Sequence, residues 1–321
     1  MTEETTVLVT APYMIPFMDR FRPVFEEADM HVIIPDVEER MEADDLMPYA
    51  GKIDGTVCGD DRYTRDVIQA FTPRLKVISK WGTGIDSIDQ EAAREFGVAV
   101  RNTPGAFTDP VSDSVLGYVL AFARRQPWLD QAMKDGQWEK IPGRAMNELK
   151  LGVVGVGKIG KAVLRKAQAF GAELFGNDIV DIDPDIVRDL GVRMMSLYEL
   201  LAVCDVISIN CDLNPSSFHL IDEDALKHVQ PHAVIINTAR GPIIEEEALI
   251  RALENGKLAG AAMDVFEFEP LPASSPLRSM DQVMLAPHNS NSSPRAWERV
   301  HWSTLGNLFT ELGHPAPKPH V

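Results

Sequence analysis

Three glycines in the segment Gly155-Val-Gly-Lys-Ile-Gly160 restrict what the middle of this 321-residue chain can fold into. The apolar run Leu151-Gly-Val-Val154 precedes them and is typical of a strand, and residues 159–170 then read as a helix closed by Gly171. In such a unit the first glycine makes the tight turn, the second lets another molecule approach the backbone, and the third lets helix and strand pack closely. The segment therefore predicts a βα unit of an open parallel α/β sheet.

A helix that begins at this turn favours anions, because its free N–H groups and its dipole both attract negative charge. Asp178 follows the next apolar run, where a carboxylate accepts hydrogen bonds from the diol of an adenosine ribose. No Lys or Arg lies between Gly171 and Arg188, so a 2′-phosphate has no evident partner. These features predict NAD, rather than NADP, as the cofactor.

Three further strand-like runs each lead to a side chain with a chemical use. These are residues 233–236 with Arg240, residues 261–263 with Glu269, and residues 283–285 with His288. Taken singly, each side chain has a simpler interpretation as part of a solvated turn or a cap. Together they supply what reduction of a keto acid needs: a rigid cation for the carboxylate, a proton donor suited to neutral pH, and a carboxylate that stabilises the charged imidazole. Because the carboxyl ends of parallel strands meet at one edge of a sheet, we expect the set to form a site.

These motifs, in this order and spacing, resemble the D-isomer-specific 2-hydroxyacid dehydrogenase family on its phosphoglycerate dehydrogenase-like side, over nearly the whole chain. The resemblance implies an α/β fold of two Rossmann-like domains. A doubly wound parallel-sheet NAD-binding domain (102–286) would be inserted in a smaller flavodoxin-like substrate domain (1–101 and 287–321). It also implies hydride transfer between the nicotinamide and C2 of a small 2-hydroxy or 2-keto acid, with a D product.

The resemblance also implies roles for individual residues. Arg240 would bind the substrate carboxylate and carbonyl, His288 would be the general acid/base, and Glu269 its partner. The cofactor-binding positions would be Gly155, Gly157, Lys158, Ile159, Gly160, Asp178, Asn210, Cys211, Thr238, Ala239 and Asp264, the last at the nicotinamide carboxamide. In the segment Lys80-Trp-Gly-Thr-Gly84, the amides of Thr83 and Gly84 would cup the substrate carboxylate, since a glycine-bracketed turn can present successive N–H groups to an anion.

One segment departs from the phosphoglycerate dehydrogenases that resemble this chain. An Arg-Ser pair often meets the phosphate there, and this chain has Cys58 and Gly59 instead. Arg62 and Lys80 remain as nearby cations and are candidate substrate-binding residues. We therefore expect a small unphosphorylated substrate and keep D-3-phosphoglycerate dehydrogenase as an alternative. A second alternative is a non-catalytic NAD(H)-sensing scaffold of the same fold, because such relatives can retain the catalytic positions.

Two further features remain open. Asp212 stands in a run, Cys211-Asp-Leu-Asn214, where the family usually has Pro-Leu-Thr against the cofactor, and it has no assigned role. The segment Asn289-Ser-Asn-Ser-Ser293 is more polar than usual, so it either touches substrate or forms a hydrated hinge.

Charge and composition limit the other classes of protein. The formal net charge is −17, and no basic stretch approaches a nucleic-acid footprint. No apolar run approaches the ~20 residues of a membrane-spanning helix, and the acidic opening Met1-Thr-Glu-Glu4 is unlike a secretory signal. Cys58, Cys204 and Cys211 lack metal-ligand spacing and are expected as buried thiols in a reducing compartment. We therefore expect a cytoplasmic protein with no metal and no nucleic-acid or membrane partner.

A homodimer is expected from the segment between the helix that starts at Asp109-Pro110 and the glycine turn. In the family, this long segment usually packs against a second subunit. Here it carries apolar side chains that a surface loop would not normally expose: Trp128, Leu129, Met133, Trp138, Ile141 and Met146.

Overall fold

A computed structural model of the chain describes residues 4–318, and the chain divides into two compact units. The first unit comprises residues 1–107 and 293–321, and the second comprises residues 108–292. The sequence predicts that the chain crosses between the domains after residues 101 and 286. The structure places these crossings a few residues later, after residues 107 and 292. The start of the acidic opening, which we compared with a secretory signal, lies outside the described residues.

Local hydrogen bonds explain why both boundaries lie later than expected. Asn102 and Thr103 bond to the carbonyl groups of Thr83 and Gly82, respectively, so this part of the linker belongs to the first unit. The backbone N–H groups of Asn289 and Ser290 bond to Asp264, which keeps these two residues, expected in the substrate domain, in the second unit.

The first unit is built on a five-stranded sheet in the order β2-β1-β3-β4-β5, in which all neighbours are parallel. This is the flavodoxin-like order that the resemblance implies. Helix α12 returns to this unit from the end of the chain and packs on β3, β4 and β5. The strands are β1 (Thr5–Val9), β2 (Met30–Ile33), β3 (Gly55–Cys58), β4 (Val77–Lys80) and β5 (Ala99–Arg101), and the helices are η1 (Ile15–Phe17), α1 (Met18–Glu27), α2 (Ala43–Leu46), η2 (Met47–Tyr49), α3 (Arg65–Phe71), α4 (Gln90–Glu95) and α12 (Pro294–Glu311).

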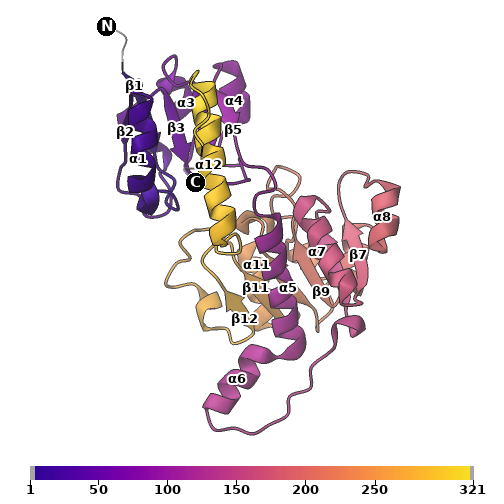
Figure 1. Cartoon of the computed structure of the whole chain (residues 1–321). Coiled ribbons are helices and arrows are strands. Elements are labelled where there is room, and N and C mark those ends of the chain that lie inside the picture. The colour runs from indigo at the N-terminus through magenta and orange to yellow at the C-terminus, as the bar shows by residue number, and fades with distance from the viewer. Residues whose placement is uncertain (1–3, 319–321) are drawn as a thin grey trace. The chain divides into compact units, whose positions relative to one another are not determined.

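The second unit is built on a seven-stranded parallel sheet in the order β12-β11-β10-β9-β6-β7-β8. Helices α5 and α7 pack against each other over this sheet (Figure 1). The strands are β6 (Lys150–Val154), β7 (Glu173–Asn177), β8 (Val192–Met194), β9 (Val206–Ile209), β10 (Val234–Asn237), β11 (Gly260–Met263) and β12 (Val283–Leu285). The helices are α5 (Thr108–Arg124), α6 (Gln126–Lys134), η3 (Met146–Glu148), α7 (Lys158–Ala169), α8 (Pro184–Leu190), α9 (Leu197–Val203), α10 (Glu223–Leu226), η4 (Gly241–Ile243), α11 (Glu246–Glu254) and η5 (Pro276–Ser279).

Burial in the larger sheet follows from its parallel topology. Every residue of β9, β10 and β11 is buried, because helices cover a parallel sheet on both faces. The strand order reverses at β6, which lies between β9 and β7. In doubly wound folds, ligands bind beyond the carboxyl ends of the strands at this switch point. The glycine turn follows β6, so the topology places it there.

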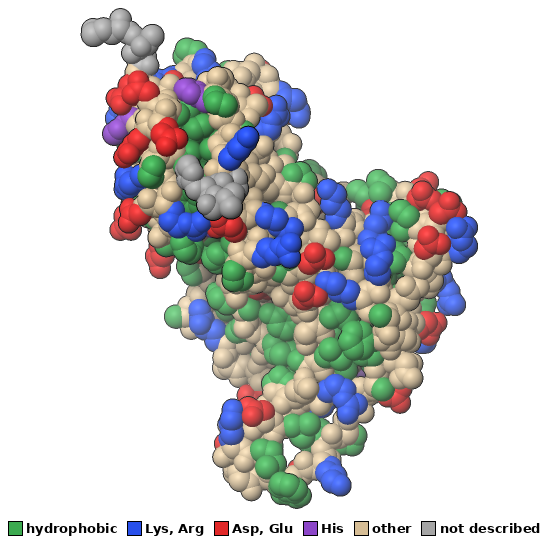
Figure 2. Space-filling model, viewed as in Figure 1, with side chains coloured by type: hydrophobic (Ala, Val, Ile, Leu, Met, Phe, Trp, Pro, Cys, Tyr) green, Lys and Arg blue, Asp and Glu red, His purple; other side chains and the backbone are tan. Residues whose placement is uncertain are grey.

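The segment after α5 forms an arm that consists of α6 and residues 135–145. Arg125 separates α5 from α6 by adopting a left-handed conformation with φ 57°. Trp138 on this arm is 83% exposed, and Met133 is 52% exposed. Figure 2 shows hydrophobic side chains on the arm at the bottom of the view. Trp128 instead packs on the ring of Phe122, and Met146 is buried, so part of the expected apolar surface serves the core of this unit.

Candidate functional site

The glycine turn has the geometry expected of a strand–turn–helix phosphate site. Gly155 has a φ of 92°, and a Cβ built on it would lie 2.6 Å from the Cα of Cys211. A Cβ on Gly160 would overlap the carbonyl oxygen of Gly155. A Cβ on Gly157 would meet nothing within 4 Å. The first and third glycines therefore serve packing, and the second leaves backbone open for a phosphate at the start of α7, which Lys158 and Ile159 begin.

Asp178 follows β7 and is tied to the glycine turn. Its Oδ2 accepts a hydrogen bond from the backbone N–H of Val156 at 2.7 Å, and its Oδ1 accepts one from Val180 at 3.1 Å. Each carboxylate oxygen has further lone pairs for a ribose hydroxyl. Ile179 and Val180 beside it are 81% and 62% exposed. This apolar pair has no role among the expectations above, although its place directly after the acid is the sequence signal for an apolar flank to an adenine ring.

Two polar atoms beyond β9 and β10 support the fit of a dinucleotide. Asn210 Oδ1 and Thr238 Oγ1 are buried and have no hydrogen-bond partner among the described residues. Buried polar atoms are normally paired, so these two are suited to a bound ligand. Together with the open backbone at Gly157 and the carboxylate of Asp178, they match the phosphate, ribose and amide groups of NAD.

Cys211 and Asp212 begin the loop after β9. Burial raises the pKa of the Cys211 thiol to about 11, and the charges of Asp212 and Asp178 contribute to the same shift. The thiol is therefore protonated at neutral pH. Cys58 and Cys204 are buried as expected, whereas Cys211 is only partly buried because it lies at the sheet edge.

The loop after β10 presents Arg240 and is shaped by Asn237. The Nδ2 of this fully buried asparagine donates to the carbonyl of Arg240 at 2.9 Å, and its Oδ1 accepts from the N–H of Ala239 at 3.1 Å. Arg240 Nη1 donates to the carbonyl of Ala239 at 2.8 Å. Asn237 thus holds the backbone of this loop, and a polar residue at the end of a buried strand is the sequence signal for such a role.

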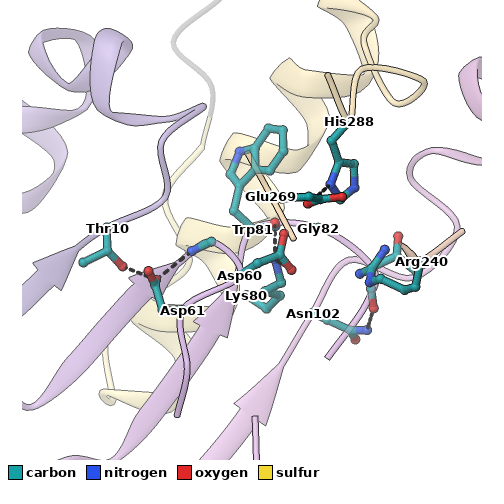
Figure 3. Close-up of polar contacts among 12 residues, drawn as sticks. Thr10, Asp60, Asp61, Lys80, Trp81, Gly82, Asn102, Arg240, Glu269 and His288 are labelled. Atoms are coloured by element: carbon teal, nitrogen blue, oxygen red, sulfur yellow. Dashed lines mark hydrogen bonds and ion pairs between the residues drawn. The ribbon is translucent and has the colours of Figure 1, made fainter. Parts of the chain in front are cut away.

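His288 and Glu269 form a direct pair in the second unit (Figure 3). The imidazole Nδ1 lies 3.1 Å from Glu269 Oε2, and Glu269 Oε1 accepts a hydrogen bond from the backbone of Phe266 at 2.9 Å. His288 has a φ of 50°, and its N–H donates to the carbonyl of Asp264 at 2.7 Å. The carboxylate thus fixes the orientation of the ring through Nδ1, and a role of Nε2 in proton exchange with a substrate stays a prediction.

Asp264 anchors the loop that carries His288. Its side chain is 1% exposed, and its two oxygens accept backbone N–H groups of Asn289 and Ser290, each at 2.8 Å. These contacts account for the first two residues of the polar segment 289–293. The expected contact of Asp264 with a nicotinamide carboxamide stays a prediction, since each oxygen can accept a second bond.

The first unit contains the turn expected to hold a carboxylate. Asn102 Nδ2 donates to the carbonyl of Thr83 at 2.6 Å, and Thr103 Oγ1 donates to the carbonyl of Gly82 at 2.8 Å. The backbone N–H groups of Thr83 and Gly84 have no acceptor among the described residues. The carbonyl groups of the turn are therefore engaged, while two successive N–H groups are left to bind an anion.

The two expected cations of this unit are both paired with acids. Lys80 is 4% exposed, and its Nζ lies 3.0 Å from Asp60 Oδ1 (Figure 3). A Cβ built on Gly82 would lie 3.7 Å from the same Nζ, so the ammonium lies next to the turn. Arg62 is more exposed and lies 4.0 Å from Glu42. Their contact with a substrate stays a prediction.

Asp61, beside this ion pair, is occupied by structural contacts. Its carboxylate accepts hydrogen bonds from the hydroxyl of Thr10 and the backbone N–H groups of Met41 and Gly59. Burial raises its pKa above the usual range, against the effect of these bonds and of Lys80. Asp61 therefore orders the segment after β3.

Within residues 4–318, no group of three or more His, Cys, Asp or Glu side chains is arranged to hold a metal ion. The same part of the chain contains no helix with the length and apolar character needed to cross a bilayer.

Comparison with known proteins agrees with this geometry. Residues 116–290 match the model of the D-isomer specific 2-hydroxyacid dehydrogenase NAD binding domain. A glyoxylate reductase of Thermofilum pendens is 36% identical over 266 residues, which are 80% of this chain and 77% of that protein. A D-3-phosphoglycerate dehydrogenase of Methanocaldococcus jannaschii is 38% identical over 238 residues, which are 73% of this chain and 45% of that protein. The crystal structure of D-lactate dehydrogenase from Aquifex aeolicus with NAD and lactic acid matches with a TM-score of 0.81 and 25% identity, covering 92% of both chains.

The chain belongs to the D-isomer specific 2-hydroxyacid dehydrogenase family. The resemblance and the fold class predicted from the sequence are therefore confirmed. As a member of this family, the protein is an NAD-dependent oxidoreductase that acts on the CH–OH group of 2-hydroxy acids. The glycine turn, Asp178 and the unpaired atoms of Asn210 and Thr238 are the features of this dehydrogenase that fit NAD.

Proposed function

We propose that this dehydrogenase reduces a small unphosphorylated 2-keto acid, with His288 as the proton donor. The 3.1 Å contact between His288 Nδ1 and Glu269 Oε2 carries the proposal, because it holds an imidazole with a carboxylate that stabilises its protonated form. When bound, NADH would supply the hydride to C2. His288 gives a proton to the carbonyl oxygen, and the products are the D-2-hydroxy acid, NAD⁺ and a neutral imidazole.

Arg240 and the turn of the first unit have separate tasks in this proposal. The guanidinium of Arg240 would hold the substrate carboxylate and polarise the carbonyl, since its planar fork stays charged at any working pH. The amides of Thr83 and Gly84 would bind a carboxylate oxygen without contributing net charge. The buried Asn237 side chain donates a hydrogen bond to the carbonyl of Arg240. This contact fixes the backbone position from which the Arg240 side chain extends.

The acid/base pair predicts a pH effect. Keto-acid reduction needs the imidazolium, so its rate falls as pH rises through the pKa of His288. The carboxylate of Glu269 favours the imidazolium and raises this pKa, so Glu269→Gln should move the falling limb of the pH–rate profile to lower pH. The exposed Glu247 of α11 provides a matched control, and Glu247→Gln should leave the limb in place. An unmoved limb in Glu269→Gln would show that the pair is not coupled.

A phosphorylated substrate is disfavoured by the segment after β3. Cys58 is buried with its thiol pKa raised by desolvation, and a Cβ built on Gly59 would lie 2.9 Å from Pro12 Cδ. Where related phosphoglycerate dehydrogenases often have an arginine, this chain therefore has a tightly packed and uncharged segment. The ammonium of Lys80 is already paired with Asp60. One missing charge-assisted contact to a phosphate is worth about 1.5–3 kcal/mol, or roughly 10- to 150-fold in specificity. D-3-phosphoglycerate dehydrogenase activity therefore remains the alternative function.

The second alternative, a non-catalytic NAD(H)-sensing scaffold, gains no specific support. Arg240, Glu269 and His288 are all present, and the histidine and glutamate are in direct contact. That contact is the one that proton transfer by His288 requires. Turnover of any 2-keto acid with NADH separates the two classes of function.

Asp178 predicts the choice between NAD(H) and NADP(H). A 2′-phosphate beside its carboxylate meets repulsion and loses a hydrogen bond, at a cost above ~1.4 kcal/mol, so NADH should be preferred by at least ~10-fold in kcat/KM. Asp178→Asn removes the charge, keeps one oxygen acceptor and should narrow the preference. The exposed neighbour Asp181 is the control, and Asp181→Asn should not change it. Equal or better use of NADPH by the unmodified protein would remove Asp178 from this role.

The arm after α5 supports a homodimer, and we propose that its exposed Trp138 and Met133 pack against a second copy of the chain. Light scattering at micromolar concentration should give the mass of two chains, and Trp138→Glu should lower it. A monomer mass for the unmodified protein would contradict this proposal.

The buried, unpaired thiols of Cys58 and Cys204 support the further proposal that the protein works in the reducing cytoplasm.

A further inference from the structure

A second histidine of the cofactor-binding unit is also paired with a carboxylate. His219 lies in the loop between β9 and α10, and its Nε2 is 2.8 Å from Glu267 Oε1. Both side chains are partly buried, with 34% and 21% of their surface exposed. The ring also stacks on Phe218, with the centroids 4.0 Å apart and the planes 17° from parallel. The nitrogen–carboxylate contact is therefore held in a defined geometry.

Glu267 ties this contact to the start of α11. Its Oε1 also accepts a hydrogen bond from the backbone N–H of Glu246 at 3.2 Å, and its own N–H donates to Glu246 Oε2 at 3.2 Å. The two carboxylates are close enough that burial, followed by the charge of Glu267, raises the pKa of Glu246. His219 offers this pair of acids a hydrogen-bond donor through Nε2.

The backbone of His219 reaches the other catalytic loop. Its N–H donates to the carbonyl of Pro242 at 2.8 Å, two residues after Arg240. Gly241 packs so closely on Phe266 that a Cβ would overlap the carbonyl group there. His219 thus contacts the Arg240 loop through its main chain and the Glu269 loop through its side chain.

The backbone conformation of His219 adds an independent observation. Its φ of 50° lies in the left-handed region, which is unfavourable for a residue with a side chain. Residues held in this region cluster at functional sites, where the surrounding contacts over-determine them. His288 has the same φ of 50°. The chain therefore accepts an unfavourable conformation at both histidines that contact the segment of residues 264–270.

We propose that His219 is a positioning residue for the acid/base pair. Its contact with Glu267 fixes the segment of residues 264–270, and this segment aims Glu269 at His288 Nδ1. Glu267 is two residues from Glu269, and the Phe266 N–H between Asp264 and Glu267 already binds Glu269 Oε1 at 2.9 Å. Loss of the His219 contact frees this turn, lengthens the Glu269–His288 contact and weakens its support of the imidazolium. The inference rests on the proposed acid/base role of His288 and Glu269.

The test compares three variants of the full-length protein with NADH and a keto acid that it reduces. His219→Phe keeps the ring and its stacking on Phe218 but has no nitrogen. His219→Gln keeps a donor for Glu267 and should restore function. His228, exposed on the same unit and packed against Tyr198 with the ring planes tilted by 44°, is the matched control as His228→Phe. The readouts are kcat, NADH binding by fluorescence, thermal unfolding, and the pKa of the His288 imidazole by NMR in the enzyme without substrate.

His219→Phe should lower kcat about 10-fold and move the His288 pKa downward in the direction of Glu269→Gln, while NADH binding stays unchanged. His219→Gln and His228→Phe should resemble the unmodified protein. An unmoved His288 pKa in His219→Phe, with or without a loss of activity, would overturn the positioning role. If His219→Phe does not fold, Glu267→Gln decides by the same readouts. A His288 pKa that does not move even in Glu269→Gln would instead overturn the acid/base pair itself.

Discussion

His288→Asn should lower kcat for keto-acid reduction by about 100-fold or more, with little change in NADH binding. The amide cannot deliver a proton to the developing alkoxide, and general acid catalysis by a positioned side chain is typically worth about 10²–10⁴-fold. Asparagine tolerates the left-handed backbone that His288 adopts at φ 50°, so the loop should keep its path.

Steady-state kinetics and NADH fluorescence titration of the same preparation check this result. His228→Asn replaces an exposed histidine of the same unit and should retain full activity. If His288→Asn keeps kcat within about threefold of the unmodified value, another group supplies the proton.

Gly241→Ala should be nearly as damaging, although glycine 241 has no side chain to contribute. A Cβ at this position would overlap the Phe266 carbonyl group and lie 2.5 Å from the Glu267 nitrogen, so one backbone segment must move. One of these segments carries Arg240 and the other carries Glu269. A misplacement of about 1 Å at reacting groups can cost roughly 10²-fold, which is the expected fall in kcat/KM.

The matched control is Gly117→Ala, because a Cβ on this helical glycine of α5 meets nothing within 4 Å. That variant should retain activity and stability. Thermal unfolding shows whether Gly241→Ala fails to fold or folds with the Arg240 and Glu269 loops displaced. A folded Gly241→Ala protein with unchanged kcat/KM would show that the two loops can separate without loss of function.

The sequence predicts the parts of this protein that depend on local pattern. The glycine turn, the helix after it and Asp178 lie where the spacing placed them, because each has a local geometric cause. The strands that lead to Arg240 and Glu269 are buried on both faces, so they are visible as continuous apolar runs. The strand that leads to His288, β12, lies at the edge of the sheet and is only partly buried, but it is also a short apolar run. The order of the strands follows from the family resemblance, since pattern alone does not specify which strands are neighbours.

The remaining features depend on contacts between distant residues. The sequence shows that Lys80 and Asp60 are both charged residues. Only the fold shows that they form an ion pair, with Lys80 Nζ 3.0 Å from Asp60 Oδ1. Asp264 is expected to bind the cofactor, and only the fold shows that its carboxylate also closes a turn 25 residues away in sequence. His219 gave no signal because its partner, Glu267, is 48 residues further along the chain.

The most direct test of the account measures kcat/KM with NADH for glyoxylate, hydroxypyruvate, larger 2-keto acids and phosphohydroxypyruvate under identical conditions. The account predicts that an unphosphorylated 2-keto acid gives the highest value, at least ~10-fold above phosphohydroxypyruvate, because the packed Cys58–Gly59 segment provides no cation for a phosphate. A phosphorylated substrate that wins by tenfold would contradict the substrate assignment, and no turnover of any of these acids would contradict the proposed catalytic role.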